Sequence, residues 1–302
     1  MGTRLLFYII LYPFSWLPLK ALYAISYLFY LIIAKVVEYR KAVINQNLRN
    51  SFPEKSEDEI DEIRDRFYKY LSEIAAEMIK MLSISRKQLV RRYRCVNPEI
   101  VDNYYDDGKS VILMSSHYNN WEWMVLGLDM FFKHYGVGVG APNSNKVFEK
   151  LINRARTRYG TEVIFANKIR EAFSCRKQND IHTSYMMLSD QSPGNPEKSF
   201  KARFLNQPTA VIYGAEHFAL KYNLPVIYYE VIKIKRGYYE LHFTLIIEKP
   251  ISTSYGEITT EYLRLLEKTI QKQPEYWLWS HKRWKHKIQI NNYERSLYES
   301  NH

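Results

Sequence analysis

Cysteine is scarce in this sequence, with only Cys95 and Cys175 among 302 residues. The two lie far apart, and neither belongs to a closely spaced pair of the kind that binds zinc or carries redox chemistry. We therefore expect a reducing compartment and no structural disulfide. The histidines and cysteines also lack the spacing of a metal site, so we expect no metal and no other cofactor.

Glycine is sparse as well, with 11 residues. The sequence contains neither a P-loop nor a G-x-G-x-x-G motif, which argues against a nucleotide-dependent enzyme. It also contains no G-x-S-x-G nucleophile elbow, which argues against a serine hydrolase. The enzyme classes that depend on these motifs are therefore disfavoured.

Acidic residues are outnumbered, because 32 Asp and Glu stand against 43 Lys and Arg and leave a formal net charge of +11. Such an excess attracts an anionic partner: nucleic acid, an acidic membrane surface, a phosphorylated substrate or an acidic carrier protein. The 26 tyrosines, together with the tryptophans, favour membrane–water interfaces, where a ring can be half dry and half wet. The mean hydropathy of -0.39 excludes a transporter with many membrane spans.

Long apolar runs are confined to the N-terminal part of the chain. The stretch from Leu5 to Ala34 contains one charge, Lys20, and is divided by Pro13 and Pro18. It is about long enough for one membrane span, which needs roughly 20 residues. The prolines and the lysine favour a kinked or interfacial helix instead. We predict that residues 1–40 form a membrane anchor, with a buried hydrophobic helix as the alternative.

The residues after this stretch bear on processing and orientation. No small-residue cleavage site follows the apolar run before Lys35, which argues against a cleaved signal peptide. Bases follow at Lys35, Arg40, Lys41 and Arg49, and by the positive-inside tendency they leave the body of the protein in the cytoplasm. We predict one further domain over residues 41–302.

Periodicity in the rest of the chain predicts an α/β fold with a mostly parallel central sheet flanked by helices. Apolar residues recur three or four apart from Ser56 to Leu82, and Ser56 with Glu59 forms a capping box, so this segment is a packing helix. Strands are predicted at Val111–Ser115, Glu162–Phe165, Ser184–Ser189, Pro225–Ile232 and Tyr239–Ile247. Helices are predicted near Trp121–Phe132, Val147–Tyr159 and Ala210–Tyr222. This alternation indicates parallel strands, with an antiparallel pair at the late end.

The most informative segment follows the first of these strands. The strand Val111–Ser115 is followed by His117, then by Asn119 and Asn120, which can cap a helix, and then by Glu122 in its first turn. Open α/β sheets place their sites at the carboxyl ends of strands. The turn can fold the imidazole back onto the Glu122 carboxylate, which would fix its tautomer and support a protonated ring. A non-catalytic binder would explain the charge and the aromatics, but not this histidine–acid pair.

Several blocks of this sequence, in order, carry a resemblance to a known family. The blocks are Gly108–Leu113 with His117–Glu122, Asn143 with Arg158-Tyr159-Gly160, Asp190-Gln191, Phe204 to Ala210 with Leu224-Pro225-Val226, and the aromatic run Pro274–Lys285. The H-x4-E box resembles that of glycerolipid acyltransferases broadly, and the whole set resembles the late acyltransferases of lipid A biosynthesis. Two departures are the bulky Tyr118-Asn119-Asn120 after the histidine and Asn206 where the family commonly has glycine.

The resemblance implies an enzyme that moves a fatty acyl group from a thioester, usually on acyl carrier protein, to a hydroxyl of a lipid A precursor. It implies His117 as general base and Glu122 as its orienting acid. Substrate-binding roles would fall to Asn119, Asn120, Asn143, Arg158, Asp190, Gln191 and Arg283. The two arginines are candidates for phosphate binding, because a guanidinium binds phosphate with two donors. His281 is expected to be structural.

The implied partners are acyl carrier protein, a glycolipid acceptor and the inner membrane, with the catalytic domain on its cytoplasmic side and no nucleic acid. Two alternatives stay open at this point. The first is an acyltransferase of the same chemistry that acts on another phospholipid or on an aminolipid. The second is a basic membrane-surface binding protein without catalytic activity.

Overall fold

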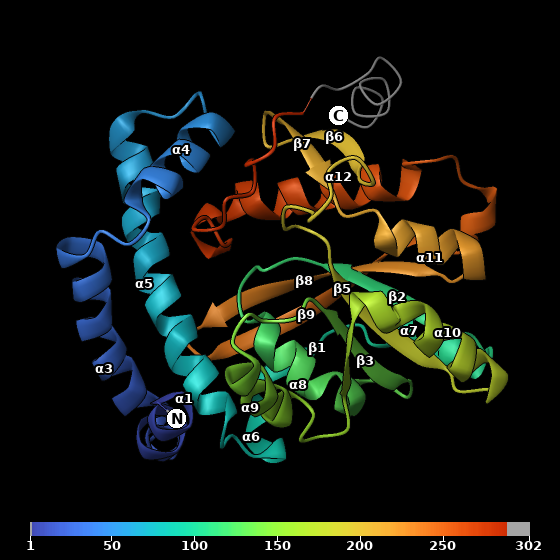
Figure 1. Ribbon diagram of the computed structural model, residues 1–302, viewed down its shortest axis with the longest axis horizontal. Coiled ribbons are helices and arrows are strands. Elements are labelled where there is room, and N and C mark those ends of the chain that lie inside the picture. The colour runs from blue at the N-terminus through green and yellow to red at the C-terminus, as the bar shows by residue number, and fades with distance from the viewer. Residues whose placement is uncertain (1, 289–302) are drawn as a thin grey trace.

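The computed structural model describes residues 2–288 and contains a seven-stranded sheet in the order β1-β9-β8-β2-β5-β3-β4 (Figure 1). Its strands are β1 (Tyr93–Cys95), β2 (Val111–Ser115), β3 (Tyr135–Gly140), β4 (Glu162–Phe165), β5 (Thr183–Leu188), β8 (Val226–Lys235) and β9 (Tyr238–Ile247). Strands β4, β3, β5, β2 and β8 run parallel, and β9 reverses against β8. The predicted α/β class with a late antiparallel pair is confirmed.

Helices cover both faces of this sheet and enclose two apolar cores. The helices around the sheet are α6 (Arg86–Arg92), α7 (Glu99–Asp106), α8 (Trp121–Phe131), α9 (Lys146–Arg156), α10 (Ile169–Gln178), α11 (Gly214–Tyr222) and α12 (Glu257–Lys272). Strand β2 shows the two-sided burial directly. Val111 and Leu113 face the core with α8, whereas Ile112 and Met114 face the core with α12. A strand buried on both faces reads as a continuous apolar run, as β2 does.

The N-terminal apolar stretch forms a series of short helices. They are α1 (Gly2–Leu6), the π-helical η1 (Phe7–Leu11), α2 (Tyr12–Ser15), α3 (Leu19–Leu31) and the π-helical η2 (Ile32–Val36). The chain breaks between α2 and α3, where Pro18 precedes the first residue of α3. Leu19–Val36 has a mean hydropathy of 1.6 and is long and apolar enough to cross a membrane by length and composition.

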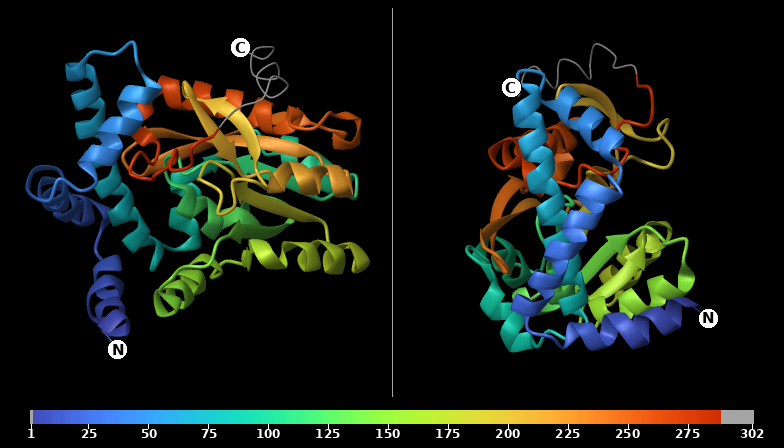
Figure 2. Two further views of the ribbon diagram at one scale, coloured as in Figure 1. Left: turned by 45° about the horizontal axis from the view of Figure 1, so that its top comes forward. Right: turned by 90° about the vertical axis from the view of Figure 1, so that its left-hand side faces the viewer.

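Helix α3 packs lengthwise on α5 (Glu57–Met81), which follows α4 (Lys41–Ser51) after a turn (Figure 2). The Tyr23 hydroxyl donates to Glu77 at 2.6 Å, and the Tyr30 hydroxyl donates to Asp65 at 2.7 Å, so two tyrosines of α3 are bonded to α5. The predicted capping box of Ser56 and Glu59 begins α5. One face of α3 is therefore part of the folded body, while Ile25 and Leu28 remain exposed on another.

The sequence prediction missed several elements, and strand β3 and one hairpin show why. Strand β3 has the sequence YGVGVG, in which glycine replaces the side chains that usually signal a strand. The hairpin of β6 (Phe200–Phe204) and β7 (Gln207–Val211) was not predicted; β7 includes Ala210 and Val211, the start of the predicted helix, and the helix α11 begins only at Gly214. The hairpin turns through Leu205 and Asn206, both with positive φ. Asparagine tolerates that backbone conformation, so Asn206 can stand where glycine is common in the family.

Candidate active site

The site forms where two neighbouring parallel strands end together. Strands β2 and β5 pair in a register that places Ser115 opposite Leu188, and the Ser189 N–H donates to the Ser115 carbonyl at 3.2 Å. His117 and Asp190 each lie two residues beyond these paired ends. The carboxyl edge of the sheet thus brings together two residues 73 positions apart in the chain. Open α/β sheets bind their ligands at this edge.

His117 and Asp190 are joined by two hydrogen bonds. The imidazole Nδ1 lies 2.8 Å from Asp190 Oδ1, and the His117 backbone N–H donates to Asp190 Oδ2 at 3.0 Å. A third donor, the indole N–H of Trp277, reaches Asp190 Oδ2 at 3.0 Å. The aspartate side chain is buried, whereas 18% of the His117 side chain remains exposed. The imidazole is therefore fixed at Nδ1 by Asp190, while part of the ring remains exposed.

The charges of this pair fix the tautomer of the histidine. Burial tends to raise the pKa of Asp190, but the nearby His117 and the three hydrogen bonds outweigh it and hold the pKa below its usual value. An ionised Asp190 can only accept hydrogen bonds, so Nδ1 of His117 must carry the proton. The lone pair of Nε2 then faces outward, which is the arrangement that a general base requires.

The outward nitrogen of His117 has two neighbours. The side-chain amide of Gln191 lies 3.2 Å from Nε2, where it can donate to the lone pair. The indole of Trp121 meets the imidazole edge-on, with ring centroids 5.0 Å apart. A hydroxyl that approaches Nε2 must therefore also approach the Gln191 amide, and the sequence prediction of Gln191 beside the site is consistent with this position.

Glu122 does not lie against the imidazole as the sequence reasoning expected. Its carboxylate forms a two-pronged ion pair with Arg156 of α9, with distances of 2.8 Å to Nε and 2.6 Å to Nη2. It also accepts from the Trp121 indole at 3.2 Å. The expectation failed because Glu122 is on the first turn of α8, which turns it toward α9, while the loop sets His117 toward β5. Sequence reasoning missed Arg156, although it is one helical turn beyond the buried Ile152 of α9.

The two asparagines after His117 hold the loop, and their amides are occupied. The Asn119 side chain is fully buried, and its Nδ2 donates to the Val231 carbonyl at 2.6 Å. Asn120 caps α8 through Oδ1, which accepts from the Trp123 N–H at 3.0 Å, and its Nδ2 donates to Glu77 at 2.5 Å. The predicted capping by asparagine is present. In this conformation both side chains are fully buried and each amide nitrogen already has a protein acceptor, so neither amide is exposed to a substrate.

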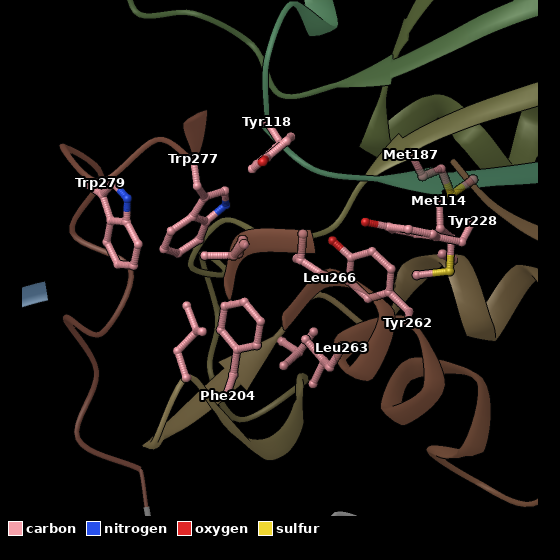
Figure 3. Close-up of a cluster of buried hydrophobic side chains, with 14 of the residues drawn as sticks. Met114, Tyr118, Met187, Phe204, Tyr228, Tyr262, Leu263, Leu266, Trp277 and Trp279 are labelled. Carbon is pink, nitrogen blue, oxygen red and sulfur yellow. The ribbon is translucent and has the colours of Figure 1, made fainter. Parts of the chain in front are cut away.

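The aromatic run Pro274–Lys285 packs against the loop that follows His117. Tyr118 and Trp277 form an isolated β-bridge, and the Asn119 N–H donates to the Tyr276 carbonyl at 3.0 Å. Trp277 packs against Trp279 and Phe204 in a buried aromatic cluster near Tyr118 (Figure 3). Trp277 therefore has two roles, because it fills a core and also donates to the catalytic aspartate candidate. Sequence reasoning placed Trp277 in the closing aromatic run and missed its bond to Asp190.

Arg283 and His281, from the same run, are both turned inward. Only 2% of Arg283 is exposed, and its Nη1 donates to the Ala210 carbonyl at 2.7 Å. This burial leaves a phosphate no direct access to the guanidinium, so the structure does not support the predicted phosphate role. His281 Nε2 accepts from the Ser192 N–H at 3.1 Å, and burial lowers the pKa of His281 to about 4. The histidine is thus held neutral in a structural bond, as expected.

Arg158 and Asn143 lie apart from the histidine. The Arg158 guanidinium donates to the carbonyls of Met81, Leu82 and Ile84, where it caps the end of α5. Three of its five N–H donors are therefore bonded to backbone carbonyls, which gives Arg158 a helix-end role, and because the residue is exposed its phosphate role stays a prediction. Asn143 is exposed in the loop before α9, where its Oδ1 accepts from the Asn145 N–H at 2.9 Å. Its substrate role stays a prediction.

An apolar cavity of about 440 Å³ adjoins the site. It is lined by Phe29, Ile33, Tyr39, Arg40, Leu71, Ile74, Ala75, Met78, Trp121, Leu278, Ser280 and His281. Trp121 forms part of its wall and also contacts the His117 imidazole. The cavity also reaches α3, whose Phe29 contributes to the lining. The cavity therefore touches both the apolar N-terminal helices and the indole that contacts His117.

An imidazole with a fixed tautomer, oriented by a buried carboxylate at the carboxyl edge of an α/β sheet, is the arrangement that general-base chemistry requires. The family model described as bacterial lipid A biosynthesis acyltransferase matches residues 2–286, nearly the whole of the chain. The chain belongs to this family and is an acyltransferase of lipid A biosynthesis at that general level. Comparison with curated protein sequences gave no match.

Proposed function

We propose that the protein transfers a fatty acyl group from an acyl thioester, carried on acyl carrier protein, to a hydroxyl of a lipid A precursor, with His117 as the general base. The single observation that carries this proposal is the His117–Asp190 pair, with Nδ1 at 2.8 Å from the carboxylate and Nε2 facing outward. The net charge of +11 suits both an acidic carrier protein and a phosphorylated acceptor.

The chemistry follows from the position of the base. Nε2 of His117 takes the proton of the acceptor hydroxyl as its oxygen attacks the thioester carbonyl carbon. The tetrahedral intermediate collapses with cleavage of the C–S bond, and the imidazolium returns its proton to the leaving thiolate. Asp190 stabilises the imidazolium between these steps, because a buried anion lies against Nδ1. The overall exchange forms an ester and a thiol without a covalent intermediate on the enzyme.

The negative oxygen of the intermediate requires a donor. The N-terminus of α8 begins four residues after His117, and helix N-termini stabilise nearby negative charge. The Gln191 amide, 3.2 Å from Nε2, is a second donor at the reacting edge of the ring. Glu122 acts through its ion pair with Arg156 and its bond to Trp121, which together keep the indole against the imidazole.

The apolar cavity beside Trp121 suits an alkyl chain. Its volume of about 440 Å³ and its mainly aliphatic and aromatic walls match the apolar part of either substrate. The cavity lies between α3 and α5, so a chain bound there would extend from the histidine toward the N-terminal helices. We propose that it holds an acyl chain during transfer.

The N-terminal helices suit attachment at a membrane surface. Large apolar side chains are exposed along them, among them Ile9 at 62%, Trp16 at 66%, Leu28 at 62% and Val36 at 77%. The opposite face of α3 is bonded to the charged helix α5 through Tyr23 and Tyr30. A helix held in this way cannot be surrounded by lipid, so we propose that α3 lies in the interface on the cytoplasmic side of the inner membrane.

The activity test uses purified protein with acyl carrier protein thioesters of several chain lengths and a phosphorylated disaccharide lipid acceptor. The products are identified by mass spectrometry. We expect transfer by the wild type and a loss of about 10²–10⁴-fold for His117→Ala with unchanged folding by circular dichroism. Near-full activity of that variant would contradict the assigned base. Transfer only to a glycerophospholipid or an aminolipid would replace the proposed acceptor and leave the chemistry in place.

The membrane test uses vesicle flotation. Substitution of Trp16, Leu28 and Val36 together by serine should weaken binding to anionic vesicles, because it removes exposed apolar area from the proposed face. The control replaces Ile181 and Ile251, which are 41% and 73% exposed and belong to segments outside the N-terminal helices. Equal flotation of the two variants would contradict the interfacial placement.

A further inference from the structure

Helix α5, in which the sequence showed only a packing pattern, buries a carboxylate behind the proposed catalytic loop, residues 117–120. Glu77 is fully buried, with an exposed fraction of 0%. Its Oε1 accepts from the Tyr23 hydroxyl at 2.6 Å, and its Oε2 accepts from Tyr239 at 2.8 Å and from Asn120 at 2.5 Å. A buried carboxylate is costly unless its oxygens are well bonded. Three donors from three different elements meet that requirement.

The bond to Asn120 reaches the catalytic loop directly. The same Asn120 side chain caps α8, because its Oδ1 accepts from the Trp123 N–H at 3.0 Å. The Trp123 indole in turn donates to the Glu77 backbone carbonyl at 3.1 Å. Glu77 therefore contacts both the residue that ends the loop and the first turn of the helix that follows. A shift of Glu77 would move this corner, three residues from His117.

The bond to Tyr23 reaches in the other direction. Tyr23 belongs to α3, the apolar helix that packs lengthwise on α5, and 7% of its surface is exposed (Figure 2). One carboxylate thus joins the helix proposed to lie in the membrane interface to the loop that carries the proposed base. Tyr30, further along α3, makes a similar bond to Asp65, but within residues 2–288 the other side chains bonded to Asp65 are Lys35 and Lys69, which lie outside the loop.

We infer that Glu77 is a positioning residue for the acyl transfer, which fixes the loop of His117 through Asn120 and is itself held in place by Tyr23 of α3. This inference rests on the proposed function, because it takes His117 as the base. It adds a requirement that the proposed function does not contain: the seating of α3 on α5 sets the geometry of the reacting imidazole. Small displacements of a catalytic group are enough to slow an enzyme strongly.

The first test compares two matched variants of α3. Tyr23→Phe and Tyr30→Phe each remove one hydroxyl that donates to a carboxylate of α5, at 2.6 Å and 2.7 Å respectively. We expect Tyr23→Phe to lower kcat about tenfold with little change in KM, and Tyr30→Phe to leave kcat nearly unchanged. Both should float with vesicles like the wild type, since the exposed apolar face is intact. The assay uses a detergent-dispersed acceptor, so that membrane binding does not limit the rate.

The second test is a double-mutant cycle between Glu77→Gln and Asn120→Ser. Serine is a good N-cap, so the second variant keeps the cap of α8 and loses the amide that reaches Glu77. If the two residues act through their shared bond, the loss of kcat in the double variant is smaller than the product of the single losses. Thermal unfolding of each variant separates a change in kcat from a loss of folded protein.

Two results would overturn the inference. One is an equal kcat for Tyr23→Phe and Tyr30→Phe, and the other is an independent, multiplicative loss in the cycle. Either result leaves the proposed function standing, provided that the wild type transfers acyl groups and His117→Ala does not. Retained activity in His117→Ala would instead remove the proposed base and the inference with it.

Discussion

Replacement of Asp190 by asparagine tests the proposed site most directly, because the two side chains have the same shape. Oδ2 of Asp190 accepts from the His117 N–H and from the Trp277 indole, both at 3.0 Å, so that position must remain an oxygen. The asparagine amide nitrogen is then forced into the place of Oδ1, at 2.8 Å from Nδ1 of His117. It can only donate there, so Nδ1 must become the acceptor and the proton must move to Nε2.

The wrong tautomer removes the lone pair that the reaction needs. We therefore expect Asp190→Asn to lower kcat roughly 10³–10⁴-fold, the size of effect that loss of an orienting carboxylate produces in a comparable pair. Binding of the substrates should change little, since the shape of the site is kept. The assay is acyl transfer from a carrier-protein thioester under saturating substrate, and ¹⁵N spectra of labelled histidine report the tautomer of His117.

Glu122→Gln is the matched control, because Glu122 is the acid that the sequence placed behind His117. This change weakens the ion pair with Arg156 and leaves Asp190 and the tautomer in place. We expect a smaller loss than for Asp190→Asn and an unchanged histidine spectrum. If Glu122→Gln is the more damaging variant, or if Asp190→Asn retains near-normal activity, the assignment of Asp190 as the orienting acid is refuted.

Three further predictions concern other parts of the molecule. Burial lowers the pKa of His281 to about 4, whereas a histidine in the unfolded chain has a pKa of about 6.5. Between these pH values the unfolded chain binds more protons than the folded one, so stability should fall as the pH drops from about 6.5 to about 4. Thermal unfolding should show that His281→Gln flattens this part of the stability profile. Arg158→Lys should lower the melting temperature, because three carbonyls lose bonds to the guanidinium at a total cost of about 1–3 kcal/mol. The variant should lower the transfer rate to phosphorylated and to dephosphorylated acceptors equally. A lower rate with the phosphorylated acceptor alone would support the phosphate role. Ala75→Phe should fill part of the apolar cavity and shift kcat/KM toward shorter acyl donors, and an unchanged chain-length profile would show that the chain binds elsewhere.

The fold class was predicted well from the sequence, because most strands are short apolar runs that can be recognised there. Val111–Ser115 was predicted with its observed bounds, and so was Glu162–Phe165. Strand prediction failed where a strand is not marked by a run of hydrophobic side chains. Strand β3 alternates glycine with valine at its core, and β7 contains Pro208 and ends at Ala210 and Val211, where a helix was predicted to begin.

The residues of the candidate site were identified from the sequence, but the acid that pairs with His117 was not. His117, Asp190 and Gln191 were all singled out, yet the acid assigned to His117 was the nearby Glu122. Sequence proximity favoured Glu122, whereas the partner that lies at Nδ1 comes from an adjacent strand 73 residues away. Strand order decides that contact, and a pattern of residues along one chain does not specify which parallel strands lie side by side. The buried Glu77 was missed for a related reason, because a helix pattern does not reveal which of its polar residues face inward.

The distance along the chain between the members of this site has a consequence for folding. His117 and Asp190 are 73 residues apart in the chain, and Asp190 and Trp277 are a further 87 residues apart. Contacts of such long range form late, since the intervening chain must lose its freedom before any of them is gained. Helices can therefore regain their ellipticity while the chain is still inactive. Recovery of enzymatic turnover after dilution from denaturant would report the last stage of assembly, when the central strands are in register and the closing aromatic run has docked.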